Sequence, residues 1–80
     1  MSDRELTYGE KAVGLTFNPS GDEKVAKIKS LYAEIIDLLV TTPVSNSDTS
    51  LRGRFLGRAI NDAVGAQMWA VKAITFKENE

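Results

Sequence analysis

Residues 22–41, DEKVAKIKSLYAEIIDLLVT, decide the fold of this chain. Their apolar side chains recur at mixed three- and four-residue spacings, which is the pattern of an amphipathic helix. These positions are Val25, Ile28, Leu31, Tyr32, Ile35, Ile36, Leu38 and Leu39. Asp22 or Ser20 can cap the start of the helix, and Pro43 cannot extend its end. The sequence therefore predicts a helix over residues 22–41.

A cluster of turn formers over residues 41–49 precedes a second, longer pattern. It predicts a helix over residues 49–77, with Asp48, Thr49 or Ser50 as its cap. The short connection favours an antiparallel hairpin. The apolar side chains of the second helix cover an arc of about 180°, which one partner helix cannot bury. We therefore expect the chain to form a homo-oligomer.

Residues 1–17 are less regular, and we expect a short helix there with bends at Gly9 and Gly14. The fold class is then all-α: one domain over residues 1–80, with a short N-terminal helix and a two-helix hairpin. A chain of 80 residues buries only about 60% of the surface that its unfolded form exposes. This shortage of core also favours association of copies.

The composition excludes several kinds of chemistry. The sequence has no Cys and no His, which rules out disulfides, thiol nucleophiles, imidazole catalysis and Cys/His metal sites. The carboxylate pair Glu34 and Asp37 is most simply a solvated surface. We therefore expect no enzyme, no cofactor and no metal.

A formal net charge of −1 argues against a duplex nucleic-acid partner. No apolar run suits a membrane span and no signal peptide begins the sequence, so we expect a cytoplasmic protein.

The turn at residues 18–22, NPSGD, is the best local candidate for anion binding. Free backbone N–H groups and the positive end of a helix dipole coincide there with Lys24 and Lys27. A capped turn without a ligand explains the same residues. Lys24 falls within the apolar arc of its helix, so it either bends into solvent or faces a phosphate at a subunit interface. Lys27 and Lys29 lie at the edges of the arc, where we expect their ammonium groups to reach outward.

Aromatic and arginine side chains supply the other candidates. Tyr8 can stack on a base or can be a buried hydrophobic residue. Tyr32 and Trp69 are more typical of core or interface positions. Arg54 and Arg58 lie on a narrow polar strip of the long helix, which is either solvated or ligand-binding.

Three strings in this order carry a family resemblance: GEKAVG at 9–14, FNPSGD at 17–22 and AQMWAVKA at 66–73. Together they resemble the small phage proteins that act as anti-CBASS cyclic-nucleotide sponges. The resemblance implies a helical hairpin with a short N-terminal helix, assembled into hexamers in the host cytoplasm. It implies a binding protein that sequesters cyclic dinucleotides such as 3′,3′-cGAMP, and cyclic trinucleotides, and so blocks activation of antiviral effectors.

The resemblance also implies roles for particular residues. Tyr8 is the expected stacking tyrosine and Lys24 the phosphate-binding lysine, with Lys27 as the alternative. Arg54 or Arg58 would serve a separate trinucleotide pocket.

Two other functional classes stay open. One is a helical adaptor that docks a host protein through the long helix. The other is a small nucleic-acid-binding regulator, which the charge balance disfavours.

Overall fold

The computed structural model describes residues 4–43 and 50–78. These residues form three α-helices: α1 (Tyr8–Val13), α2 (Glu23–Val40) and α3 (Leu51–Thr75). No strand occurs among the residues described, so the predicted all-α class is confirmed. Within the same residues, no helix has both the length and the apolar character that crossing a membrane requires.

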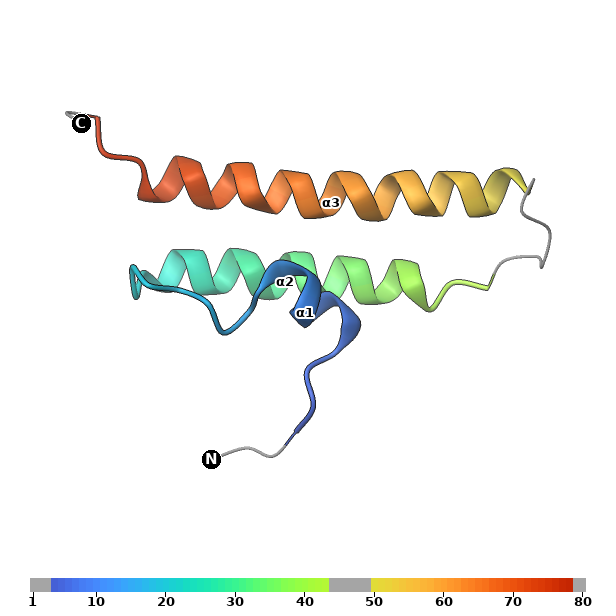
Figure 1. Cartoon of the computed structure of the whole chain (residues 1–80), viewed down its shortest axis with the longest axis horizontal. Helices are drawn as coiled ribbons and strands as arrows, with labels where there is room; N and C mark the ends of the chain where they lie inside the picture. The colour runs from blue at the N-terminus through green and yellow to red at the C-terminus, as the bar shows by residue number, and fades with distance from the viewer. Residues whose placement is uncertain (1–3, 44–49, 79–80) are drawn as a thin grey trace.

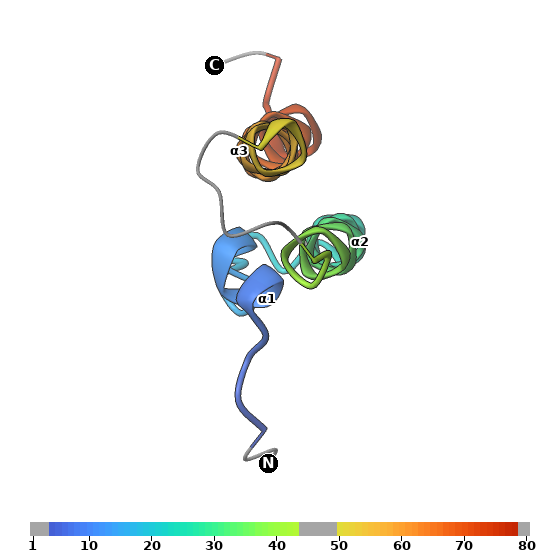
Figure 2. The same cartoon turned by 90° about the vertical axis from the view of Figure 1, so that its right-hand side faces the viewer.

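The three helices form a thin arrangement rather than a rounded bundle. In Figure 1, α3 runs back alongside α2 in the opposite direction, and α1 crosses in front of α2. Figure 2, which looks along the helices, shows α3 above α2 and α1 to the left of α2. Helix α2 is therefore the central element, because both other helices pack on it.

The helix ends follow from local capping. Asp22 caps α2, and its carboxylate accepts a hydrogen bond from the backbone N–H of Lys24 at 2.8 Å. The predicted range of 22–41 thus includes both caps of α2, since Thr41 is the C-cap. Ser50 caps α3 by accepting from the N–H of Gly53 at 2.9 Å.

Helix α3 is shorter than the predicted span of 49–77. It begins at Leu51, and it ends at Thr75 because Phe76 adopts extended backbone angles, with φ −68° and ψ 138°. Of the three capping candidates, Asp48 and Thr49 lie outside the described residues, and Ser50 takes the role.

The buried core lies where all three helices meet. Its centre consists of Val13 from α1 and Ala33 and Ile36 from α2, with Ile36 fully buried. Partly buried apolar side chains surround it: Ala12, Leu15, Tyr32, Ile60, Ala63 and Val64. Tyr32 therefore belongs to the core region, as its position in the helical pattern predicts.

Much apolar surface stays outside this core. Within α3, whose residues are all described, only Gln67 is buried, while Phe55, Met68 and Trp69 are each more than half exposed. The chain exposes 6279 Å², whereas a compact monomer of 8.7 kDa exposes roughly 4,700 Å². One side of α3 has no covering element within the described chain.

Candidate functional site

Helix α1 docks on a stripe of α2 formed by Lys29, Ala33 and Asp37. At the start of α1, the backbone N–H of Gly9 donates a hydrogen bond to Oδ1 of Asp37 at 2.7 Å. Gly9 is buried, and a Cβ atom at this position would lie 2.1 Å from the carbonyl oxygen of Ala33. Only glycine fits this approach, so Gly9 serves close packing rather than the bend expected from the sequence.

Lys29 binds the other end of α1, which corrects the expectation that its ammonium group reaches outward. The side chain is buried, and its ammonium donates to the carbonyl oxygens of Gly14, at 3.1 Å, and Phe17. The ammonium also lies 5.6 Å from the centre of the Phe17 ring. The buried charge is thus satisfied by backbone acceptors that follow α1.

Asp37 also differs from its expected role. The sequence indicates a solvated acidic pair with Glu34, and Glu34 is indeed exposed. Asp37 is only partly exposed, because α1 covers it and uses its carboxylate as an acceptor. The face of α2 that carries Asp37 is therefore a packing surface.

The first turn of α1 carries its own capping box. The Thr7 hydroxyl accepts from the N–H of Glu10 at 3.1 Å, and the Glu10 carboxylate accepts from the N–H of Thr7 at 2.9 Å. Arg4 donates to both carboxylate oxygens of Glu10, at 2.7 and 3.1 Å. The hydrogen bond from Arg4 is the largest cause that lowers the pKa of Glu10, and the hydrogen bond from the Thr7 backbone is the next. The hydrogen bond between Arg4 and Glu10 also raises the pKa of Arg4.

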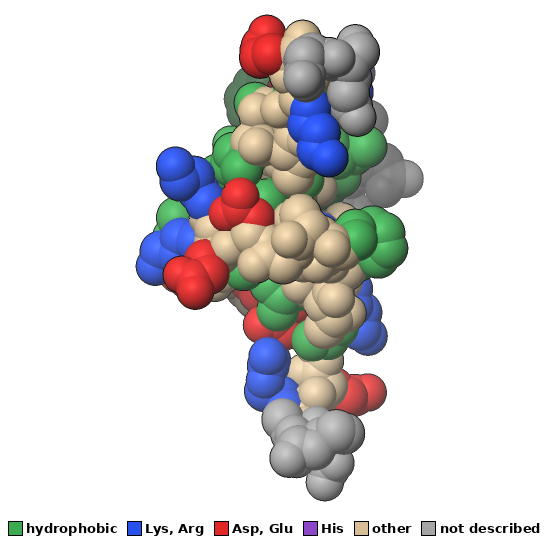
Figure 3. Space-filling view, turned by 90° about the vertical axis from the view of Figure 1, so that its left-hand side faces the viewer, with side chains coloured by type: hydrophobic (Ala, Val, Ile, Leu, Met, Phe, Trp, Pro, Cys, Tyr) green, Lys and Arg blue, Asp and Glu red, His purple; other side chains and the backbone are tan. Residues whose placement is uncertain are grey.

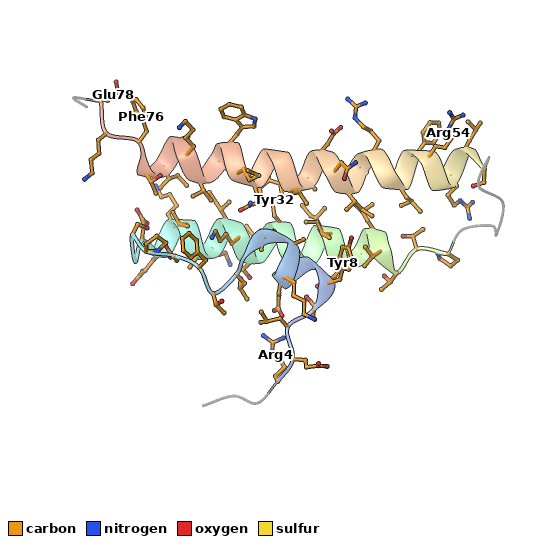
Figure 4. All side chains as sticks on the ribbon, in the orientation of Figure 1. Arg4, Tyr8, Tyr32, Arg54, Phe76 and Glu78 are labelled. Atoms are coloured by element: carbon orange, nitrogen blue, oxygen red, sulfur yellow. The ribbon has the colours of Figure 1, made fainter. Side chains whose placement is uncertain are left out.

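Tyr8 is the first residue of α1 and is 60% exposed in the single chain. Tyr8 is therefore not a buried hydrophobic residue in the single chain, which was one of the two interpretations of the sequence. Figure 4 shows Tyr8 near the half of α2 that leads to the hairpin connection. Its backbone adjoins Gly9, which α2 holds, so the ring is available while its attachment point is fixed.

The turn at residues 18–22 satisfies most of its polar groups internally. Ser20 donates to the side-chain oxygen of Asn18 at 2.7 Å and accepts from the N–H of Asp22 at 3.1 Å. The Asn18 amide donates to the carbonyl of Asp22 at 3.1 Å. The Asp22 carboxylate occupies the N-terminus of α2, where an anion would otherwise bind. These contacts describe a capped turn, the alternative to anion binding by this turn.

Lys24 and Lys27 are both exposed on α2. Figure 3 views the end of the molecule at which α2 begins and α3 finishes, and there basic and acidic side chains alternate over the described surface. The single chain thus presents separate cations at this end rather than one continuous basic patch.

Tyr8 and Lys24 do not meet within one chain. The residue after Tyr8 is bound to Asp37, and Lys24 lies 13 residues before Asp37 on the same helix. At a rise of 1.5 Å per residue, this separation is about 20 Å along α2. The two residues that the resemblance assigns to one ligand are therefore at different places on the hairpin.

The two candidate arginines lie on the exposed side of α3. Figure 4 shows Arg54 projecting from α3 on the side away from α2, whereas Tyr8 lies beside α2. Arg58 is exposed and its Nε atom lies 2.9 and 3.0 Å from the two carboxylate oxygens of Asp62. The chain alone does not bring either arginine to Tyr8.

Two hollows lie on the surface of the single chain, and neither is an enclosed ligand pocket. One, of about 210 Å³, is lined by residues of the 17–20 turn together with Val25, Lys29, Val71 and Thr75. This volume is below the roughly 300–1,000 Å³ of typical ligand sites. The other, of about 440 Å³, is an open depression lined by Gly65, Met68, Trp69 and Lys72. No cluster of acidic residues suited to a metal ion occurs in residues 4–43 and 50–78.

The fold and the site define a class of small helical proteins in which a short N-terminal helix presents an aromatic side chain beside a helical hairpin. The sequence profile of the family described as "Acb2/Tad1, hairpin domain" matches residues 10–75, and the chain belongs to this family. The resemblance to the anti-CBASS cyclic-nucleotide sponges is thereby confirmed. Comparisons with curated proteins and with solved structures gave no match.

Proposed function

We propose that this protein is a phage sponge that binds cyclic dinucleotides such as 3′,3′-cGAMP in the host cytoplasm and keeps them from CBASS effectors. It performs no chemistry on the ligand, because sequestration alone lowers the free messenger concentration. Family membership over residues 10–75 supports this proposal. The exposed ring of Tyr8 supplies an aromatic face of the kind that stacks on a base.

The separation of Tyr8 from Lys24 by about 20 Å along α2 supports a ligand site that is shared between copies of the chain. A ligand that touches both residues takes the tyrosine from one copy and the lysine from another. A cyclic dinucleotide has two bases and two phosphates, so a two-fold interface offers it matching pairs of both groups. Lys27, one turn further along α2, is the alternative phosphate contact.

Exposed apolar surface supports assembly into a homo-oligomer, for which the resemblance implies six copies. Leu31, Ile35 and Leu38 follow one another along α2 at helical spacing and are 45, 47 and 71% exposed. Burying such side chains against another copy contributes roughly 25 cal/mol per Å². The same surface fits the alternative function, a helical adaptor for a host protein. A stable homo-oligomer in analytical ultracentrifugation would argue against the adaptor.

The arginines of α3 support a second, trinucleotide site in the assembled protein. Arg54 projects from α3 on the side away from α2, and Arg58, one turn further along α3, is also exposed. The pair between Arg58 and Asp62 is exposed, with side chains 79 and 64% accessible, so it contributes little and a phosphate can replace the carboxylate.

Calorimetry with 3′,3′-cGAMP tests the proposed function. We expect binding by the wild type, and a loss of about tenfold or more in affinity for Tyr8→Ala and for Lys24→Ala, since each removes a stacking or charged contact. Glu23→Gln, next to Lys24 on the same exposed turn, is the control and should bind with little change. The absence of binding by the wild type at micromolar protein would refute the proposal.

A further inference from the structure

The stripe of α2 that receives α1 has charges matched to the two ends of that helix. Asp37 lies at the N-terminus of α1, where the dipole is positive, and Lys29 lies after its C-terminus, where it is negative. Ala33 lies between them on successive turns of α2 and contacts Gly9. Figure 1 shows α1 running in the opposite direction to α2, which is the orientation that this charge order favours.

We infer that Asp37 is a positioning residue for the ligand site: its carboxylate holds the N–H of Gly9 and thereby presents the ring of Tyr8. The inference rests on the proposed function, because Tyr8 contacts a ligand only there. Asp37 itself does not touch the ligand. It acts through the backbone of the residue that follows the tyrosine.

The geometry at Gly9 makes this contact specific. The distance of 2.7 Å between Gly9 N and Asp37 Oδ1 is typical of a charge-assisted hydrogen bond. The N–H group of Gly9 belongs to the first turn of α1, where backbone donors have no partner within the helix. Since a Cβ atom on residue 9 would overlap the Ala33 carbonyl, the backbone beside Tyr8 lies directly on α2.

Holding this backbone matters for binding because α1 is only six residues long. Helices of this length do not persist in water without tertiary contacts. With the backbone fixed, Tyr8 retains only its two side-chain torsions, so little ordering is left for the ligand to impose. A ligand that meets an undocked α1 must order the segment before it can stack.

The test combines binding with an NMR signal of the contact itself. We expect Asp37→Ala to bind 3′,3′-cGAMP about tenfold more weakly than the wild type. Asp37→Asn retains an acceptor oxygen and should lose less. Glu34→Gln removes an exposed carboxylate from the same helix and should bind like the wild type. In Asp37→Ala, the Gly9 amide proton should move upfield and exchange faster with solvent, and Glu34→Gln should leave it unchanged.

A double-mutant cycle separates positioning from a general structural role. If Asp37 acts through Tyr8, Asp37→Ala causes no further loss in a Tyr8→Ala background. Gly9→Ala, which forces α1 away from Ala33, should reproduce the loss of Asp37→Ala without adding to it. Circular dichroism should show nearly unchanged helix content in all variants, because α2 and α3 contain most of the helical residues.

The outcomes distinguish this inference from the proposed function. A wild type that does not bind 3′,3′-cGAMP refutes the proposed function. A wild type that binds, with Asp37→Ala binding equally well, overturns the positioning role alone. The positioning role is also overturned if the losses of affinity add in the double mutant, or if the Gly9 amide signal is unchanged by Asp37→Ala.

Discussion

Three donors hold the Glu10 carboxylate at the start of α1. Two come from the Arg4 guanidinium, at 2.7 and 3.1 Å, and the third is the backbone N–H of Thr7 at 2.9 Å. All three favour the ionised carboxylate, so the pKa of Glu10 lies below its ordinary value, with the Arg4 hydrogen bond as the largest cause. The protonation of this one side chain is therefore linked to the folding of α1.

The sign of this linkage gives a pH prediction. Because folding lowers the pKa of Glu10, its contribution to stability is present above the unfolded value of about 4.3 and is lost as pH falls through the folded value. Glu10→Gln keeps an acceptor for the Thr7 N–H but has no charge. We expect the melting temperature of this variant to fall below that of the wild type near neutral pH, with the difference shrinking in acid. A difference that grows as the pH falls would contradict the assignment.

At the same scale, the sequence predicts contacts between near neighbours better than contacts between helices. Ser50 and Asp22 are predictable caps, because the cap and its N–H partner are two or three residues apart. The roles of Lys29 and Asp37 were not predictable from the helical pattern of α2. That pattern assigns one apolar face to the core, whereas α1 packs on a second face through polar groups.

The stability of helix α1 depends on the contacts at its two ends. Its six residues close with a Schellman motif, in which Gly14 N–H donates to Lys11 O at 3.1 Å and Leu15 N–H to Glu10 O at 3.0 Å. Gly14 has φ +64°, a left-handed conformation that other residues adopt at a cost. The expected bend at Gly14 is thus the turn that ends α1 and directs the chain toward Phe17.

Gly14→Ala tests this helix end. We expect it to lower the free energy of unfolding by about 1 kcal/mol, because alanine is strained at this φ. Gly57→Ala is the matched control. Gly57 lies within α3, and a Cβ added there would meet no side chain and no other element within 4 Å, so alanine should raise stability by up to about 1 kcal/mol. Urea denaturation measures both changes. Equal effects of the two substitutions would show that the left-handed conformation is not what Gly14 supplies.

The long helices were predictable as elements because the spacing of apolar residues repeats over several turns in each. Only the ends differ, since Ser50 and Phe76 leave the helical conformation at the two ends of α3. A six-residue helix has fewer than two turns, so its pattern cannot be told from a loop. This is why the sequence indicates a short helix within residues 1–17 without its bounds.

At the scale of the whole molecule, the described residues leave one side of the hairpin formed by α2 and α3 without a covering element. The shortest dimension of the molecule is 13 Å, and large side chains of α2 and α3 lie in solvent. The width of the apolar arc on α3 predicts this from sequence alone. The sequence does not predict which surface of another copy covers each face. The spacing of apolar residues shows that a helix has an apolar face, but it does not show what packs against that face. The separation of Tyr8 from Lys24 likewise needed the structure, since it depends on where α1 docks.

Trp69 offers a test of the uncovered face of α3, since its side chain is 72% exposed. We expect Trp69→Glu to weaken self-association about tenfold or more, because a charge would replace a large apolar contact. Asn61→Glu adds the same charge at an exposed polar position of α3 and should leave self-association nearly unchanged. Sedimentation velocity over a range of concentrations measures both. If Trp69→Glu associates like the wild type, this face does not contact another copy.

The most direct measurement is a crystal structure of the protein with 3′,3′-cGAMP bound. Docking of α1 at Asp37 places Tyr8 about 20 Å along α2 from Lys24. We therefore predict that one ligand molecule stacks on Tyr8 of one copy while its phosphate contacts Lys24 of a neighbouring copy. A ligand held by Tyr8 and Lys24 of the same chain, or bound away from both residues, would contradict it.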